Sequence, residues 1–301
     1  SSRRRHTRYP LVTAVQTCAL PIECLFPAAG LRTRFLPATK ETPKEMLPLV
    51  DRPIISYGVE EAVASGCSDI VIITGRTKRS MEDYFDRSWE LEALLEQRGK
   101  KELLERVRSV SEGKNIVYAR QPEPLGLGHA VSCGEPFCRD GFFGVILPDD
   151  VMIGEPPVLS QLVSVHDRLG GSVIALEEVS EEDTARYGVV AAERVEDNVY
   201  RILDLVEKPG PEKAPSRLAI MGRYVLSPTI FPLIRDVRPG AGGEIQLTDA
   251  IRLLKDVESL WGVVYSGKRL DCGTQTGWLY ANVAMAMRDP VLRRVVESAL
   301  S

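Results

Sequence analysis

The sequence predicts an α/β protein built on an open, doubly wound and mostly parallel β-sheet, with a mixed β extension in the second half of the chain. Two observations carry this prediction. From Glu23 onward, short β-branched or apolar runs alternate with longer amphipathic runs, which is the pattern of parallel strands joined by crossover helices. After about Val179, turns rich in Pro and Gly separate the strand-like runs instead, which indicates a mixed sheet. In such a sheet ligands bind at the carboxyl ends of the strands, so functional residues are expected there.

The expected elements follow this alternation in chain order. The first strand covers residues 24–28, a helix covers 53–65 and the second strand covers 69–74. Residues 78–110 carry apolar side chains three and four positions apart, which predicts one long helix or two helices joined near Gly99. Further strands are expected at residues 115–120, 144–147, 172–177, 188–195, 199–206 and 219–226.

Composition and charge are those of a globular chain. Of the 301 residues, 44% are apolar and 27% are charged, which excludes collagen, a disordered chain and a small disulfide-stapled fold. The net charge of −4 gives no basic excess for a nucleic-acid backbone, and no apolar run approaches the roughly 20 residues of a membrane-spanning helix. The six cysteines form no Cys-x-x-Cys pair and the three histidines are scattered. Zinc is therefore not expected, whereas free thiols in the cytoplasm are.

Residues 1–22 are interpreted as a non-native leader. They contain four arginines, no acidic residue and no strand or helix period. Their apolar stretch is too interrupted for a secretory signal. The part from Val12 to Ile22 is similar to the in-frame translation of a common sequencing-adapter oligonucleotide. The alternative is a genuine basic arm. Residues 23–301 are expected to form a single domain, because no linker-like stretch divides them.

The loop after the first strand has the composition of a polyphosphate site. Ala28, Ala29 and Gly30 form a small-residue turn that leaves backbone N–H groups free, and Arg34 and Lys44 add positive charge. The loop is neither a Walker lysine loop nor a dinucleotide fingerprint. An ordinary strand-to-helix loop with solvated basic side chains is the alternative.

Residues 30–48 resemble the signature of the sugar-1-phosphate nucleotidyltransferases, which is Gly-x-Gly-Thr-Arg followed by Pro, Thr and a Pro-Lys pair. Residues 43–48 fit the bacterial UTP:glucose-1-phosphate uridylyltransferase branch of that family closely, and residues 85–95 and 240–251 also look like this branch. Arg32 departs from the signature, because the family has its second glycine there. If that glycine adopts a positive φ or lets the phosphates approach closely, an arginine would strain or block the loop.

The resemblance implies a Rossmann-like fold and the transfer of UMP from UTP to glucose 1-phosphate, giving UDP-glucose and pyrophosphate, with Mg²⁺ as the cofactor. The domain is then expected to consist of a nucleotide and metal lobe at about 23–155 and a sugar lobe at about 156–301. We expect a cytoplasmic homo-oligomer that acts without nucleic acid or membrane. Two alternatives stay open. One is a regulatory paralogue that has lost turnover, for which Arg32 is the only support, and the other is a thymidylyl or cytidylyl transferase on the same scaffold.

A second loop, residues 119–130, overlaps the end of the strand expected at 115–120. Gln121 offers both a donor and an acceptor, which suits the N3–H and a carbonyl of a pyrimidine, and Gly126 permits a base or ribose to lie against the backbone. Taken alone, a loop of this composition is weak evidence. The resemblance implies that both residues surround the nucleoside.

Carboxylates at strand ends provide the candidate metal site. Asp149 follows the strand expected at 144–147, and Asp271 follows a strand-like run near the end of the chain. Carboxylate oxygens are the protein ligands that Mg²⁺ prefers, and the resemblance implies that both aspartates are associated with the metal. Asp150 is expected to cap a turn.

Gly188, Glu207 and Lys208 are the candidate sugar-binding residues. A glutamate can accept hydrogen bonds from two sugar hydroxyls, a lysine can pair with the sugar's phosphate, and a glycine allows close backbone approach. An ordinary Glu–Lys pair at the end of a strand is the alternative. By resemblance, Arg34 and Lys44 would serve the leaving pyrophosphate and the α-phosphate, and Lys208 would serve the sugar phosphate.

Overall fold

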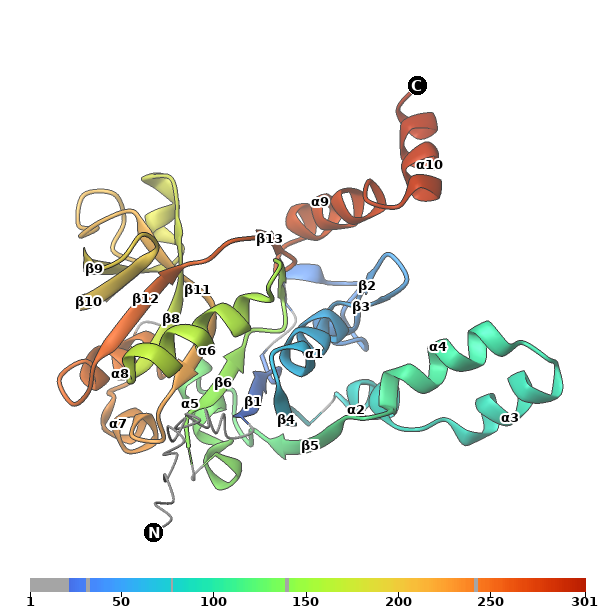
Figure 1. Cartoon of the computed structure of the whole chain (residues 1–301), viewed down its shortest axis with the longest axis horizontal. Helices are drawn as coiled ribbons and strands as arrows, with labels where there is room; N and C mark the ends of the chain where they lie inside the picture. The colour runs from blue at the N-terminus through green and yellow to red at the C-terminus, as the bar shows by residue number, and fades with distance from the viewer. Residues whose placement is uncertain (1–21, 31–32, 77, 139–140, 241–242) are drawn as a thin grey trace, which may run out of the picture.

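The computed structural model describes residues 22–30, 33–76, 78–138, 141–240 and 243–301 (Figure 1). The predicted leader lies outside these residues except for Ile22, and Arg32 lies outside them too. A nine-stranded sheet with the strand order β5-β4-β1-β6-β11-β8-β12-β10-β9 forms the centre of the fold. One core packs α1 and α6 against one face of the sheet, and a second core packs α5, α7 and α8 against the other face.

The first half of the sheet is parallel. It consists of β1 (Ile22–Pro27), β4 (Cys67–Thr74), β5 (Asn115–Arg120) and β6 (Phe143–Ile146), and every pairing among them is parallel. Residues 70–73 of β4 are apolar and buried without interruption, as expected for a strand that is covered on both faces. The strands predicted for this half are therefore confirmed, with ends that differ by one or two residues.

Residues 79–111 form three helices: α2 (Arg79–Phe85), α3 (Trp89–Gln97) and α4 (Lys101–Ser111). The predicted break near Gly99 is confirmed, and this glycine has a φ of +65°. The earlier break between α2 and α3 was not predicted. It allows Arg87 to leave the helix and to donate from Nε and Nη2 to the carboxylate of Glu92, at 2.9 and 2.8 Å. Figure 1 shows that α3 and α4 form a hairpin that projects from the body of the molecule.

The second half of the sheet is largely antiparallel and closes on itself. The strand β11 pairs antiparallel with β6, β8 and β9, and β10 pairs antiparallel with β9 and β12, whereas β8 and β12 are parallel. Its strands are β8 (Ser172–Glu178), β9 (Gly188–Arg194), β10 (Val199–Glu207), β11 (Leu218–Leu226) and β12 (Leu260–Val264). The predicted mixed β extension is thus confirmed.

The prediction of an open, mostly parallel sheet is wrong for this half. The strand β9 turns back to pair with β11 through Val189 and Ala219, so that β11, β8, β12, β10 and β9 form a closed ring. Irregular registers at 202–204 of β10 and at 220–224 of β11 mark where the strands bend. Such irregularities increase the local twist of a strand and help a sheet to curl into a barrel.

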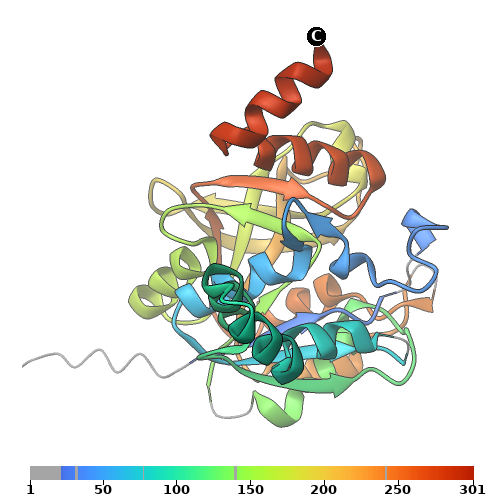
Figure 2. The same cartoon turned by 90° about the vertical axis from the view of Figure 1, so that its right-hand side faces the viewer.

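The remaining elements connect or flank the sheet. The helix α1 (Ile54–Ala64) packs closely on the parallel strands, because a Cβ on Gly58 would lie only 3.0 Å from Phe26 and 3.1 Å from Ile146. Figure 2 shows α10 standing away from the body next to α9. Within the described residues, no helix combines the length and the apolar character needed to cross a membrane. The other elements are β2 (Pro48–Leu49), β3 (Arg52–Pro53), β7 (Asp150–Ile153), β13 (Lys268–Asp271), α5 (Leu127–Ser132), α6 (Val158–Leu169), α7 (Ile230–Asp236), α8 (Leu247–Leu254), α9 (Gln275–Ala286), α10 (Pro290–Leu300), and the 3₁₀ turns at Thr33–Phe35, Lys44–Met46, Glu135–Phe137 and Glu182–Ala185.

Candidate active site

A cavity of about 500 Å³ opens at the carboxyl ends of β1, β5 and β6. This is the position that a sheet of parallel strands offers to ligands. Most of the residues predicted for the nucleotide line it, together with the metal candidate Asp149. The lining residues are Pro27, Ala29, Gly30, Thr33, Arg34, Lys44, Gln121, Pro124, Gly126, Leu127, Ala130, Asp149 and Glu244.

The turn after β1 presents its backbone to the cavity. The N–H of Ala28 donates to the carbonyl of Ile73 at 2.9 Å, which extends the ladder between β1 and β4 by one residue. Ala28 itself is fully buried beneath the cavity, whereas Ala29 and Gly30 line it. A Cβ on Gly30 would meet nothing within 4 Å. Arg32, the residue expected to strain or block this loop, lies outside the described residues.

Lys44 and Asp149 form an ion pair in the cavity, with 2.5 Å between Nζ and Oδ2. Burial alone would raise the pKa of the Asp149 carboxyl, but the charges of Lys44 and Arg34 and the hydrogen bond from Lys44 outweigh it, so this pKa lies below its usual value. Burial opposes the charged form of Lys44, yet Asp149 and Glu45 outweigh it and raise the pKa of the ammonium. Both partners of the pair are therefore charged at neutral pH.

A second, buried ion pair holds the segment that carries Lys44. Glu45 is 1% exposed, and both of its carboxylate oxygens lie 3.1 Å from Nζ of Lys78. Lys78 also donates to the carbonyl of Ala28, which fixes the segment to the turn after β1. Since a buried charge must be paired, this arrangement determines where Lys44 can lie.

The two metal candidates face a common point. The strand β13 pairs with β7 so that Asp271 is opposite Asp150, and the N–H of Cys272 donates to the carbonyl of Asp149 at 2.8 Å. A Cβ placed on Gly273 would lie 3.1 Å from Oδ1 of Asp271 and 3.2 Å from Oδ2 of Asp149. Asp149 lines the cavity and Asp271 does not, but their carboxylates converge on Gly273, and carboxylate oxygens are the ligands that Mg²⁺ prefers.

Asp150 corrects the sequence interpretation, because it is more than a turn cap. It is 7% exposed, begins β7, and its Oδ1 lies 2.7 Å from Nη2 of Arg269. Burial raises the pKa of Asp150 to about 6, against the opposing charge of Arg269. Arg269 also donates to the hydroxyl of Tyr187 at 3.2 Å, and Arg186 donates to Asp271 at 3.2 Å.

The loop expected to hold the base is folded onto the second half of the chain. Gln121 is 6% exposed, donates from Nε2 to the carbonyl of Gly126 at 3.2 Å and contacts Nδ1 of His129 at 3.0 Å. The N–H of Ile245 donates to the carbonyl of Leu125 at 2.7 Å. These contacts bring Glu244 to the cavity wall beside Gly126.

The sugar candidates lie together, but they do not line the cavity. Gly188 pairs with Glu207 between β9 and β10, and Nζ of Lys208 lies 3.1 Å from Oε1 of Glu207. A Cβ on Gly188 would lie 3.1 Å from Thr248 at the start of α8. Thr248 thus packs against the strand pair that carries the sugar candidates, and the sugar roles stay predictions.

Three residues near the site carried no sequence signal that singled them out: Arg186, Arg269 and Arg223. Their partners are distant in the sequence, and the full burial of Arg223 within β11 is seen only in the structure. Glu244 lies in the Gly-rich stretch that marked the family resemblance, but it carried no chemical argument there.

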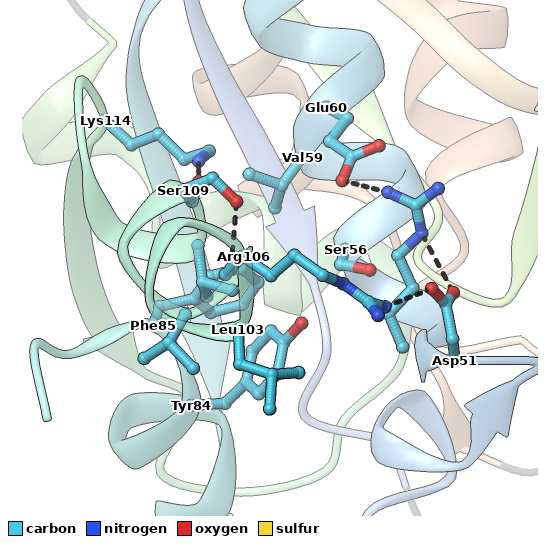
Figure 3. A pocket seen from close by; sticks show the side chains of 13 residues that line it. Asp51, Ser56, Val59, Glu60, Tyr84, Phe85, Leu103, Arg106, Ser109 and Lys114 are labelled. Carbon is cyan, nitrogen blue, oxygen red and sulfur yellow. Dashed lines mark hydrogen bonds and ion pairs between the residues drawn. The ribbon is translucent and has the colours of Figure 1, made fainter. Parts of the chain in front are cut away.

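A second cavity, of about 680 Å³, lies between α1, α2 and α4 (Figure 3). None of the predicted site residues lines it. Its charged side chains pair with one another, as Arg106 does with Asp51 at 2.6 Å and Arg52 with Glu60 at 2.6 Å. We therefore assign the chemistry to the smaller cavity, where Lys44, Arg34 and Asp149 converge.

The fold and the smaller cavity define the class of protein, an α/β protein with cations and carboxylates gathered at the ends of parallel strands. The family described as nucleotidyl transferase matches residues 27–287, and the chain belongs to this family of enzymes.

Similar proteins narrow the comparison. The UTP--glucose-1-phosphate uridylyltransferase YngB of Bacillus subtilis (strain 168) is 49% identical over 271 residues, which are 90% of this chain and 91% of that protein. The UTP--glucose-1-phosphate uridylyltransferase of Pseudomonas aeruginosa is 47% identical over 86% of this chain and 94% of its own length.

Solved structures agree with this comparison. A UDP-glucose pyrophosphorylase complexed with UDP-glucose has a TM-score of 0.83 and 44% identity, and the match covers 90% of this chain and 100% of that one. A UTP-bound enzyme from Acinetobacter baumannii has a TM-score of 0.86 and 36% identity, over 93% of this chain and 99% of its own.

Proposed function

We propose that this protein transfers UMP from UTP to glucose 1-phosphate, giving UDP-glucose and pyrophosphate. The observation that carries the proposal is the convergence of Lys44, Arg34 and Asp149 in one cavity at the ends of the parallel strands. The names and bound ligands of the similar proteins support the choice of UTP and glucose 1-phosphate. We also propose Mg²⁺ as the metal, the cytoplasm as the location and a homo-oligomer as the working form.

The reaction needs no nucleophile from the protein. A phosphate oxygen of glucose 1-phosphate attacks the α-phosphorus of UTP. The bond between this phosphorus and the oxygen that bridges to the β-phosphorus breaks, and pyrophosphate leaves with the bonding electrons. The protein's task is to align two polyanions and to neutralise their charge. Bound between Asp149 and Asp271, Mg²⁺ would supply positive charge to the phosphate oxygens.

The cations of the cavity are suited to this task. Lys44 stays charged at neutral pH despite its burial, because Asp149 and Glu45 keep its pKa above the ordinary value, and Arg34 is close enough to act electrostatically on both Lys44 and Asp149. We assign Lys44 and Arg34 to the α-phosphate and the leaving pyrophosphate. Lys208 is assigned to the phosphate of the sugar, and Gly188 and Glu207 are assigned to the hexose.

Gln121 is the candidate for recognising the pyrimidine. Its side chain is held at the cavity wall by the carbonyl of Gly126 and by His129. These two contacts can occupy both N–H donors of the amide, so the group offered to the base is the acceptor Oε1. It suits the N3–H of uracil, and thymine presents the same N3–H. The alternative of a thymidylyl or cytidylyl transferase is therefore tested by comparing kcat/KM for UTP, dTTP and CTP.

Release of pyrophosphate from UTP, glucose 1-phosphate and Mg²⁺ tests the proposal directly. We expect turnover by the wild-type chain and its loss in Lys44→Met. The exposed Lys100, at the tip of the α3–α4 hairpin, offers the matched control Lys100→Met, which should retain turnover. Absence of turnover in the wild-type chain, with turnover restored by Arg32→Gly, would support the alternative of an impaired paralogue.

A further inference from the structure

A fully buried arginine connects α1 to the two halves of the sheet. Arg223 lies on β11 opposite Ile146 of β6, and it is 0% exposed. Its Nε lies 3.0 Å from both carboxylate oxygens of Glu61 on α1, and its Nη2 donates to Oε2 of Glu61 at 2.7 Å. Glu61 in turn accepts from the N–H of Leu159 at 3.0 Å, at the start of α6. Two helices therefore anchor the guanidinium.

The same guanidinium also contacts the turn that carries Asp149. Nη2 donates to the carbonyl of Asp150 at 2.9 Å, and Nη1 lies 3.5 Å from the carbonyl of Leu147. A Cβ on Gly222 would lie 2.9 Å from Cβ of Leu147, so the turn is pressed against β11. Arg223 thus contacts the backbone on both sides of Asp149 without lining the cavity.

Backbone hydrogen bonds hold the two ends of this turn. The N–H of Leu147 donates to the carbonyl of Gly222 on β11 at 2.9 Å, and Asp150 begins the pairing of β7 with β13. Arg223 is the side chain that contacts the carbonyls of both Leu147 and Asp150 across the turn. A buried ion pair is in general a weak source of stability, because the desolvation of both charges opposes their attraction. Arg223 therefore adds contacts to the backbone of the turn at 147–150, and the side chain of Asp149 in this turn lines the cavity.

We propose that Arg223, anchored by Glu61, is a positioning residue that fixes the turn at 147–150, so that the carboxylate of Asp149 faces Lys44 and Asp271. This inference rests on the proposed function, because it assigns Asp149 to the metal and the phosphates. A displacement of a reacting group by about 1 Å can cost 100-fold in rate, so the hold on the backbone is expected to matter for turnover.

Three variants separate a positioning role from a structural one. Arg223→Met leaves the buried carboxylate of Glu61 without its charged partner, so the Tm is expected to fall. In the double variant Glu61→Leu, Arg223→Met both charges are gone, and replacing a buried pair with apolar side chains is often neutral for stability. Arg223→Lys retains a charge beside Glu61, but it has one nitrogen in place of three, on a side chain that ends one bond short of the Nη2 that contacts both Glu61 and the carbonyl of Asp150.

Activity and binding are then measured side by side. We expect the double variant to regain most of the Tm lost in Arg223→Met, while its kcat/KM stays about 10- to 100-fold below wild type. Isothermal titration with UTP in EDTA should give a Kd within about twofold of wild type, because the contacts of the base loop are unchanged. Adding Mg²⁺ should tighten UTP binding less in the double variant than in wild type, since the carboxylate of Asp149 is no longer fixed.

Recovery of Tm, kcat/KM and the Mg²⁺ effect together would overturn the proposal, because the pair would then serve the fold alone. If the double variant does not fold, Arg223→Lys takes its place. A folded Arg223→Lys with wild-type kcat/KM and an unchanged Mg²⁺ effect would overturn the proposal, and a 10-fold loss with unchanged UTP binding in EDTA would support it. The wild-type chain, assayed in parallel, reports on the proposed function separately: if it releases no pyrophosphate, that function fails, and the Mg²⁺ effect on UTP binding still tests the position of Asp149.

Discussion

Replacing Gly126 with alanine should detach the base loop from the wall of the nucleotide cavity. Gly126 has a φ of +101° and a ψ of 178°, a conformation that is essentially restricted to glycine. A Cβ at this position would also lie 2.8 Å from the carbonyl oxygen and 2.9 Å from the amide nitrogen of Ile245. Both contacts are with backbone atoms, which cannot rotate away as the end of a side chain can.

The size of the effect follows from this geometry. A non-glycine residue held in such a backbone region costs roughly 1–3 kcal/mol. The loop can relieve that strain only by giving up its fit against Ile245, which it contacts through backbone hydrogen bonds, next to Glu244 on the cavity wall. Since UTP binding would require the loop to return, we expect its Kd to rise between about 5-fold and 150-fold.

Isothermal titration of UTP into Gly126→Ala and wild type measures this change. Gly99→Ala is a matched control, because Gly99 also has a positive φ of +65° but meets nothing within 4 Å and lies in the turn between α3 and α4. The control should lose a few degrees of Tm and bind UTP normally. A Kd for Gly126→Ala within twofold of wild type would refute the reasoning, because the loop would then not form part of the nucleotide site.

Three further predictions concern the metal, the sugar phosphate and the projecting hairpin. Asp149→Ala should abolish pyrophosphate release while UTP binding in EDTA persists in part, and unchanged Mg²⁺-dependent turnover would remove Asp149 from the mechanism. Lys208→Ala should raise the KM for glucose 1-phosphate and lower kcat with little change in the Kd of UTP, and a collapse of UTP binding would contradict the assignment of Lys208 to the sugar side. Hydrogen bonds from Arg87 and Arg108 lower the pKa of Glu92 to about 2 from an ordinary 4.5, so the ion pairs stabilise the fold above about pH 4.5 and lose this effect as the pH falls towards 2. Wild type should accordingly have a higher Tm than Glu92→Gln at pH 7, and this difference should disappear as the pH falls from about 4.5 towards 2. A Tm difference that does not depend on pH would count against the role of these ion pairs.

The strands and most of the site could be predicted because their signals are local. A strand buried on both faces appears as a run of apolar residues, as in residues 70–73 of β4, and parallel strands place their carboxyl ends together. Arg34, Lys44, Gln121 and Asp149 therefore follow strands in the sequence and line one cavity in the structure.

Features set by distant parts of the chain could not be predicted in this way. The ring closes through Val189 and Ala219, and no local pattern indicates which strand will be the partner of β9. The partner of Asp150 is Arg269, more than a hundred positions away, so the sequence alone suggested only a turn cap. Lys208 does not line the cavity, and the position of its strand pair depends on the packing of Thr248 of α8 beside Gly188 of β9, which no local pattern indicates.

The strand β11 belongs to both halves of the sheet at once. Residues 223–226 pair with β6, whereas Ala219 reaches β9 beside the sugar candidates, and β8 pairs with residues of both stretches. Rotation of one half against the other would therefore break main-chain hydrogen bonds between β11 and its neighbours on both sides. We accordingly expect a crosslink between the two halves of the sheet to leave pyrophosphate release intact.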